Sequence, residues 1–423
     1  MPPIDQAIVD EASIELNRRQ ISKLAAGSIA ILGVSAIDGV ARSDDSGATR
    51  TAQDTPGVAP TGDDWIVHTE IPANREAPLP RLIENYVTPV DRFYVRSHAA
   101  NPVIDPSAYR LNIDGMVARG GPWSLDELSQ RFEPVQITAT MTCAGNRRYE
   151  HSRTQTIGGV PWREGAIGNA VWRGYRLSDL LSEVGVDANA RHVWFDGLDN
   201  IDKNGSTIPF GASIPIEKAM PEDASGDVGA ILCTHMNGSV LTPDHGFPLR
   251  VVVPGYIGAR SVKWLGRIRV DDRENPNHYQ STAYKIVYQA SPIEWAERAA
   301  IYRFPINAAI CVPTSGATIS DGPSRVTVRG YALPPGEPDA SISSVELSID
   351  GGQRWVDAEL IGPDQPLCWR LWRAELELPA AANQIIVRAT DTRGNTQPER
   401  TAWNKKGYLY NAQHRVDLKR SER

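Results

Sequence analysis

The sequence predicts an α+β protein in which a large mixed domain is followed by a smaller antiparallel β-sandwich. The chain has 423 residues, which is enough for two or three domains with well-packed cores. Its 35 glycines, 31 prolines and 11 tryptophans favour loops and sheets over a helical bundle. Short strands and short amphipathic helices mix between residues 80 and 295, and regularly spaced alternating strands replace them from about residue 307.

Composition and charge exclude several classes of protein. Hydrophobic residues make up 41% of the chain and charged residues 22%, which is typical of a soluble globular protein. The formal net charge is -7, and Lys and Arg form no long run, so nucleic acid is not an expected partner. The four cysteines include no CxxC pair, which argues against a structural zinc site. A disulfide between two of Cys233, Cys311 and Cys368 would suit an exported protein.

The N-terminal segment has the pattern of an export signal. Residues 17–23, NRRQISK, resemble the twin-arginine signals of bacteria, and a mildly apolar run follows at 24–37. That run is short and rich in Gly, Ala and Ser, so it does not predict a membrane span, and residues 39–41 offer a cleavage site. We therefore expect a signal at 1–41, export to the periplasm or beyond, and a polar, disordered linker at 42–64. The alternative is a short amphipathic helix with a chance arginine pair.

The mixed domain is expected to occupy residues 65–300. Ser124 is a candidate N-cap and Glu127 stands at the capping-box position, so they predict the start of a short helix. Apolar residues at helical spacing from 177 to 184 predict a second helix, which Gly185 ends. The predicted strands lie at 93–96, 111–115, 135–142, 192–195 and 249–253.

The second domain, expected at residues 301–418, has short strands in which apolar and polar residues alternate strictly. Asp350 and Gly351 form a hairpin turn after one of these strands. The pattern is typical of an antiparallel sandwich of about a hundred residues. This part contains no cluster of titratable residues, which indicates a structural or pairing role. Its predicted strands lie at 326–328, 345–349, 369–378 and 385–389.

The stretch VQITATMTCAGNRR, residues 135–148, is the first candidate site. Its period-two pattern predicts a strand that ends at Cys143, and Arg147 and Arg148 follow after a short turn. Nearby positive charge favours the thiolate, which is the form that ligates metals and attacks substrates. The alternative from the local pattern is a buried cysteine that closes a strand beside two surface arginines.

Two turns rich in glycine and proline carry candidate anion-binding groups. In residues 244–250, DHGFPLR, a rigid turn separates His245 from Arg250, so both could meet an anionic group, or both could be solvated. Residues 254–265, PGYIGARSVKWL, combine small residues that permit close backbone approach with two cations. Neither stretch matches a P-loop or a GxGxxG pattern, so a nucleotide is not the implied anion.

Arg96 lies where a predicted strand gives way to a loop, two residues before His98. Arginine presents a planar, permanently charged fork that suits oxyanions. Taken alone, either side chain would be interpreted as a surface residue.

Taken together, these motifs resemble the sulfite oxidase family of molybdenum-cofactor enzymes, in its haem-free bacterial form. The resemblance covers about residues 80–418. It implies a mixed sulfite-oxidase-type molybdopterin-binding domain followed by a C-terminal immunoglobulin-like β-sandwich that serves dimerisation. The motifs are TMTCAGNRR, PW-x2-GAIGNAVW-x-G from Pro161, MNG-x5-DHGFPLRVVVPG from Met236, GARSVKWLGRI from Gly258 and NKKGYLYNAQHRV from Asn404.

The resemblance implies one molybdenum ion with one molybdopterin as the cofactor, and no haem. Cys143 looks like the thiolate that binds molybdenum, because soft sulfur ligands suit this metal. Residues 94–98 resemble the family's F-x-RNH segment, with Ser97 in place of Asn. The implied cofactor contacts are Tyr94, Val95, Arg96, Ser97, His98, Cys143, Asp199, His245, Arg250, Ser261, Val262 and Lys263.

The reaction that the resemblance implies is oxygen-atom transfer from molybdenum to sulfite, which gives sulfate, followed by two one-electron transfers. Arg96 and Arg148 would hold the dianion, and Tyr284 would lie near the metal. Lys406 stands where the animal and plant enzymes have an arginine, so the charge is kept but the bidentate fork is lost. The implied catalytic residues are Cys143, Tyr284, Arg96, Arg148, Trp162 and Lys406.

The expected partners are a second copy of the chain, as a homodimer, and an external electron acceptor such as a c-type cytochrome, because the sequence has no haem-attachment pattern. The nearest alternative enzyme is a sulfane dehydrogenase-like subunit that acts on protein-bound sulfur. Its relatives differ around the turn at residues 255–260, which here looks like the sulfite enzymes. An alternative of another class is a binding module whose catalytic half has decayed, and Cys143 argues against it. Arg147 receives no role.

Overall fold

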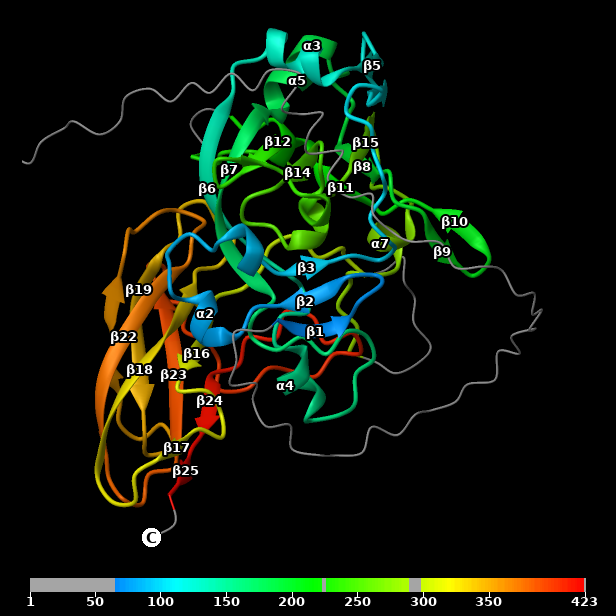
Figure 1. Cartoon of the computed structure of the whole chain (residues 1–423). Coiled ribbons are helices and arrows are strands. Elements are labelled where there is room, and N and C mark those ends of the chain that lie inside the picture. Colours follow the sequence, from blue (N-terminus) through cyan, green and yellow to red (C-terminus); the bar gives the residue numbers. More distant parts are fainter. Residues whose placement is uncertain (1–64, 223–225, 289–297, 422–423) are drawn as a thin grey trace, which may run out of the picture. The chain divides into compact units, whose positions relative to one another are not determined.

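The structure is a computed structural model that describes residues 65–222, 226–288 and 298–421 (Figure 1). The predicted signal and linker lie outside the described residues. The described chain is mostly sheet, and no helix in it exceeds eight residues, so the α+β prediction holds only in a coarse sense. The helices are α2 (Leu79–Leu82), α3 (Leu125–Arg131), α4 (Arg148–Ser152), α5 (Leu177–Val184), α6 (Ile216–Ala219), α7 (His278–Ser281) and the 3-10 turns η1 (Val90–Arg92), η3 (Pro243–His245) and η4 (Gly258–Arg260).

Two five-stranded sheets form the framework of the mixed part. The first has the order β11-β8-β15-β4-β5, and the second has the order β13-β12-β7-β6, with β14 also paired to β12. The strands of the first are β4 (Leu111–Gly115), β5 (Gly121–Trp123), β8 (His192–Gly197), β11 (Gly211–Pro215) and β15 (Leu265–Asp271). Those of the second are β6 (Val135–Thr142), β7 (Ile167–Arg176), β12 (Ile231–Met236), β13 (Ser239–Val240) and β14 (Arg250–Val252).

Alternation along the central strands sends neighbouring side chains to different cores. On β12, Leu232 belongs to the larger core, which α3 and α5 cover, whereas Ile231 and Cys233 belong to the core that contains Cys143. The predicted capping box is confirmed, because Ser124 Oγ accepts from Glu127 N at 3.1 Å. The same sheet thus supports helices on one side and the candidate site on the other.

A small sheet near the start of the described chain contains one predicted strand, at 93–96, and two strands that the sequence patterns had not indicated. It has the order β1-β2-β3, with β1 (Ile66–Thr69), β2 (Asn74–Glu76) and β3 (Val95–Arg96), and Figure 1 shows these strands side by side. A second small element is the hairpin of β9 (Ile201–Lys203) and β10 (Ser206–Ile208).

The C-terminal part contains two four-stranded sheets that share one core. Their orders are β16-β18-β22-β21 and β20-β19-β23-β24. The first comprises β16 (Asn307–Val312), β18 (Ser324–Leu333), β21 (Glu359–Ile361) and β22 (Arg370–Leu378). The second comprises β19 (Ile342–Ser348), β20 (Val356–Asp357), β23 (Gln384–Asp391) and β24 (His414–Asp417), and β17 (Thr318–Ile319) pairs with β25 (Lys419–Arg420). The predicted alternating strands are therefore present.

Hydrogen bonds join the C-terminal sheets to the turn that follows β6. The Tyr331 hydroxyl donates to Glu164 O at 2.8 Å and accepts from Asn146 Nδ2 at 3.1 Å. Arg147 Nη1 donates to Asn307 Oδ1 at 2.8 Å. The turn that carries Cys143 is thus held partly by residues far away in the sequence.

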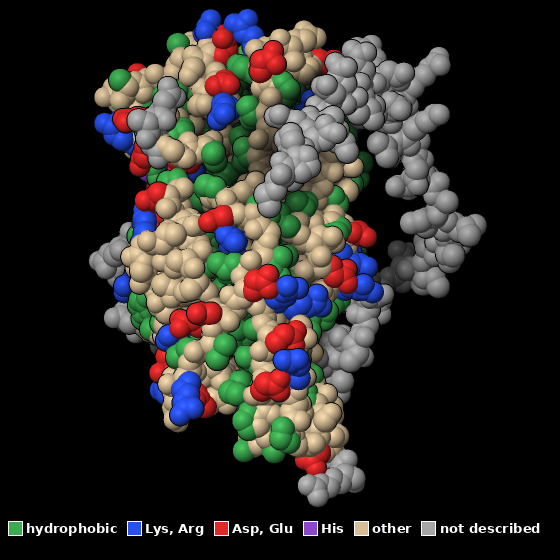
Figure 2. All heavy atoms as spheres, turned by 90° about the vertical axis from the view of Figure 1, so that its left-hand side faces the viewer, with side chains coloured by type: hydrophobic (Ala, Val, Ile, Leu, Met, Phe, Trp, Pro, Cys, Tyr) green, Lys and Arg blue, Asp and Glu red, His purple; other side chains and the backbone are tan. Residues whose placement is uncertain are grey.

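The suggestion of a disulfide is wrong, because all four cysteines are free and buried. Cys233 lies in β12, Cys311 in β16, and Cys368 donates to Thr138 O at 3.2 Å instead of pairing with sulfur. No helix among the described residues is long and apolar enough to cross a membrane. The face in Figure 2 carries acidic and basic side chains in alternation rather than as one field of a single sign.

Candidate active site

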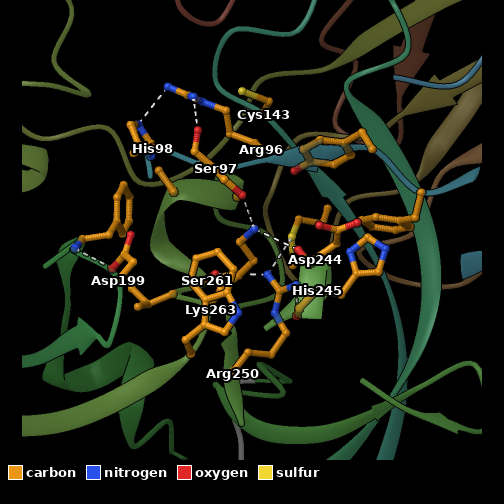
Figure 3. A pocket seen from close by; sticks show the side chains of 18 of the residues that line it. Arg96, Ser97, His98, Cys143, Asp199, Asp244, His245, Arg250, Ser261 and Lys263 are labelled. Atoms are coloured by element: carbon orange, nitrogen blue, oxygen red, sulfur yellow. Dashed lines mark hydrogen bonds between the residues drawn. The ribbon is translucent and has the colours of Figure 1, made fainter. Parts of the chain in front are cut away.

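One cavity collects most of the residues predicted to bind a cofactor or substrate. It encloses about 670 Å³ not filled by atoms, counting open solvent at its mouth. The predicted residues that line it are Tyr94, Arg96, Ser97, His98, Cys143, Asp199, His245, Arg250, Ser261, Val262, Lys263 and Tyr284 (Figure 3).

Cys143 is held at the end of β6 by its own turn. Its N–H donates to Ala166 O at 2.9 Å, and its carbonyl accepts from Asn146 N at 2.9 Å. Its Sγ atom accepts a long contact from Gly145 N at 3.4 Å. A Cβ atom at Gly145 would lie 2.5 Å from the Arg148 guanidinium, so a side chain there would displace this group. The backbone therefore fixes the thiol at the cavity wall while leaving the sulfur without a strong partner.

Two cations, the buried Arg250 and the partly buried Lys263, line the other end of the cavity, where Figure 3 shows them together with His245. Arg250 donates to His245 O at 3.0 Å and to Ser261 O at 3.1 Å. Lys263 Nζ donates to Ser97 Oγ and to Asp244 O, each at 2.8 Å. Among the described residues, no carboxylate bonds to either cation. Buried charges usually have a counter-charge, so this end of the cavity is prepared for an anion.

Burial and the neighbouring charges keep the histidines of the cavity neutral. Burial first, and then Arg250, lowers the pKa of His245 to about 3, so its Nε2–H donates to Val90 O at 3.2 Å. Burial and Arg96 lower the pKa of His98 well below its usual value. His98 Nε2 therefore accepts from Arg96 Nη2 at 2.8 Å, and its Nδ1 carries the proton.

Lys263 gives a pH-dependent expectation for the cofactor-free protein. Burial and Arg250 lower its pKa from 10.5 to about 7. Between pH 7 and 10.5 the unfolded chain therefore binds more protons at this lysine, so the folded state gains stability as pH rises. The free energy of unfolding of the wild type minus that of Lys263→Met should rise across this window and level off on either side. Urea unfolding of both proteins at several pH values measures this difference. A difference that does not change with pH would mean that Lys263 stays charged in the folded protein across this window.

Arg96 is oriented by three hydrogen bonds. Its Nη1 donates to Asn74 Oδ1 at 2.9 Å and to Ser97 O at 2.7 Å, and its Nη2 bonds to His98. Asn74 is itself fixed, because its amide nitrogen donates to Thr69 Oγ1 at 2.7 Å. The small N-terminal sheet thus aligns the predicted oxyanion contact, a role that no sequence pattern had indicated.

Four of the predicted residues do not line the cavity wall. Val95 is a buried residue of β3. Trp162 lies in the same core as Cys143, and its Nε1 has no hydrogen-bond partner among the described residues. Arg148 is buried and donates through Nε to Lys406 O at 2.9 Å. Lys406 is half-buried, and burial with Lys203 lowers its pKa. These residues surround the cavity rather than forming its lining.

The structure also assigns places to residues that the sequence reasoning missed. Arg147 is fully buried and binds Glu150 through Nε at 2.6 Å, so it is a structural residue. Tyr408 stacks on Tyr284 with ring centroids 5.2 Å apart. Tyr408 stands in the NKKGYLYNAQHRV motif, which was a signal, but nothing in the sequence indicated what it contacts. Other lining residues without a prediction are Phe93, Met141, Phe210, Asp244, Gly258, Ala259 and Trp264.

Comparisons with known proteins identify the family of the chain. Residues 98–279 match the oxidoreductase molybdopterin-binding domain, and residues 298–421 match the Mo-co oxidoreductase dimerisation domain. The chain is 40% identical to the mitochondrial sulfite oxidase of Mus musculus over 385 residues, which are 85% of this chain and 67% of that protein. It is 35% identical to the sulfite oxidase of Arabidopsis thaliana, over 84% of this chain and 93% of that protein. The chain belongs to the sulfite oxidase family of molybdenum oxidoreductases.

The chain also matches a longer sulfite oxidase and a solved enzyme of another name. It spans 65% of the human mitochondrial sulfite oxidase, at 40% identity. The solved SoxCD sulfane dehydrogenase of Paracoccus pantotrophus matches with a TM-score of 0.68, over 84% of this chain and 89% of that chain. At 23% identity, that match shows a shared fold.

The cavity of this sulfite oxidase-family chain fits a molybdopterin. A soft thiol at one end suits molybdenum, and the cations at the other end suit a phosphate. A side chain at Gly258 would lie 2.6 Å from the Tyr94 hydroxyl, so glycine permits close packing at this wall. The residues that would hold the group are Cys143 for the metal and His245, Arg250, Ser261 and Lys263 for the pterin phosphate.

Proposed function

We propose that the protein oxidises sulfite to sulfate by molybdenum-dependent oxygen-atom transfer and passes the electrons to an external acceptor. The observation that carries this proposal is the buried pairing of a thiol with a cation-lined cavity in a chain of this family. When bound, the molybdenum cofactor supplies the oxygen atom and accepts two electrons.

The protein's share of the reaction is to position the substrate and balance its charge. Arg96 is held by Asn74, Ser97 and His98, so its remaining N–H groups are available to an oxyanion in a fixed direction. Arg148 adds positive charge near Tyr284, which is buried at the cavity wall, and Lys406 lies near Arg148. Preorganised charge of this kind stabilises an anionic transition state without reorganisation.

Replacement of Arg96 by glutamine should raise the Michaelis constant for sulfite by about 10- to 100-fold, because a charge-assisted contact to the anion is lost. Steady-state kinetics at matched molybdenum content measure this effect. Arg119→Gln is a surface control, since Arg119 lies far from this cavity in the groove beside α3. An unchanged Michaelis constant in Arg96→Gln would mean that the anion binds elsewhere.

The test of the proposed function is a steady-state assay of purified, molybdenum-loaded protein. Sulfite should reduce an added acceptor, and cytochrome c, ferricyanide and oxygen can be compared directly. The alternative is a sulfane dehydrogenase-like reaction on protein-bound sulfur. Turnover of a cysteine persulfide protein without turnover of sulfite would favour that alternative.

We also propose a homodimer formed through the C-terminal part, a c-type cytochrome as acceptor, and export through a twin-arginine signal. The match of residues 298–421 to a dimerisation domain supports the first proposal. The arginine pair at residues 18–19 supports the last. Light scattering of the purified protein tests the dimer, and cell fractionation with and without Arg18→Lys plus Arg19→Lys tests export.

A further inference from the structure

Tyr408 contacts two of the residues proposed for the chemistry. Its ring stacks on Tyr284, with centroids 5.2 Å apart and an interplanar angle of 20°. The guanidinium carbon of Arg148 lies 5.2 Å from the centroid of the same ring. Tyr408 is buried, so these contacts are largely shielded from water. One aromatic side chain therefore meets both a proposed anion-binding cation and a proposed active-site phenol.

Hydrogen bonds fix the backbone around Tyr408 next to the turn that carries Cys143. The Asn404 side chain accepts from Tyr408 N at 3.0 Å and donates to Tyr408 O at 2.9 Å. The next residue, Leu409, donates its N–H to Ala144 O at 2.8 Å, which is directly beside Cys143. The backbone that carries the ring is therefore fixed against the turn that carries the thiol.

Backbone atoms surround the Arg148 side chain closely. Its Nε donates to Lys406 O at 2.9 Å and its Nη1 to Val160 O at 2.7 Å. A side chain at Gly145 would lie 2.5 Å from its Nη2, and one at Gly407 would lie 2.7 Å from its Cγ. Backbone thus confines the edges of the guanidinium, while the Tyr408 ring covers a face. A directed contact between the guanidinium and an oxyanion requires the guanidinium plane to be set correctly.

We propose that Tyr408 is a positioning residue that sets the plane of the Arg148 guanidinium, so that its unbonded nitrogen meets a small oxyanion. The inference rests on the proposed function, which assigns Arg148 to the anion. Cation–π contacts of this kind change affinity by about 2- to 30-fold.

Tyr410 provides a matched control in the same segment. The guanidinium carbon of Arg147 lies 5.1 Å from its ring centroid, so the type of contact is the same. Arg147, however, uses Nε and Nη2 for Glu150 and Nη1 for Asn307, so all three of its nitrogens are already bonded. Loss of the Tyr410 ring should therefore affect folding stability and not the binding of anions.

The experiment compares the molybdenum-loaded wild type with Tyr408→Leu, Tyr408→Phe and Tyr410→Leu. Calorimetric titration gives the dissociation constant for sulfate, and kinetics give kcat and the Michaelis constant for sulfite. Tyr408→Leu should raise both constants by about 2- to 30-fold with a smaller change in kcat. Tyr408→Phe, which keeps the π face, should restore most of the affinity, and Tyr410→Leu should lower the melting temperature without changing sulfate binding.

Three results would overturn the inference. Equal sulfate affinity in Tyr408→Leu and wild type would show that the ring does not position Arg148. A loss in Tyr408→Phe as large as that in Tyr408→Leu would show that the hydroxyl matters instead. In both cases the wild type still binds sulfate and oxidises sulfite, so the proposed function stands. A wild type that neither binds sulfate nor oxidises sulfite would overturn the proposed function and this inference together.

Discussion

Cys143→Ser should lower sulfite oxidation by at least about 100-fold while the protein stays folded. Loss of a residue that only supports a metal ligand already costs about 10- to 100-fold, so loss of the ligand itself should cost more. The folded state should lose only about 1 kcal/mol, because Sγ makes one long contact, with Gly145 N at 3.4 Å. Acceptor reduction, molybdenum content and thermal melting together measure the effect.

Cys233→Ser is the matched control for that substitution. Cys233 is fully buried in the same core as Cys143, but it does not line the cavity. The Cys233→Ser variant should have a lower melting temperature than the wild type and keep its activity per bound molybdenum. A fully active Cys143→Ser variant would remove this residue from the set of metal ligands.

Arg250→Met should abolish retention of the pterin and yet leave the cofactor-free protein as stable as before or more stable. Arg250 is buried, bonds to carbonyls such as His245 O, and has no carboxylate partner among the described residues. Burial lowers its pKa to about 10, so it stays charged near neutral pH. An unpaired buried charge costs free energy, so its replacement by an apolar side chain should offset the loss of the carbonyl contacts. Urea unfolding and pterin analysis measure the two effects.

Arg147→Met should destabilise the cofactor-free protein, in contrast to Arg250→Met. Arg147 is equally buried, but it is paired with Glu150 through Nε and Nη2 at 2.6 and 2.8 Å. Its removal leaves a carboxylate in a poorly solvated place, so the cofactor-free protein should lose about 3–5 kcal/mol. If both variants destabilised the cofactor-free protein equally, the cation-lined end of the cavity would not be a prepared anion site.

Local patterns predicted the elements that local physics determines. β6 follows the alternation of residues 135–142, and α3 begins where Ser124 and Glu127 form a capping box. The turn at Asp350 and Gly351 follows β19, as expected. In each case the interaction that fixes the element lies within a few residues.

Long-range contacts determine the side-chain partners that local sequence patterns did not predict. Arg147 and Arg148 are neighbours, but Arg147 has a left-handed backbone with φ of 64°, and the two side chains find separate partners. Arg147 reaches Asn307, and Arg148 reaches Lys406 O, 258 residues away. The alignment of Arg96 by Asn74 also depends on the pairing of β3 with β2, a strand that no sequence pattern had indicated. Pairings over such distances leave no periodic signal.

The most direct test of the account is an anaerobic single turnover of purified, molybdenum-loaded protein with excess sulfite and no acceptor. One sulfate should form for each bound molybdenum, and an added one-electron acceptor should then take two equivalents. A protein that contains both molybdenum and pterin but forms no sulfate from sulfite would contradict it.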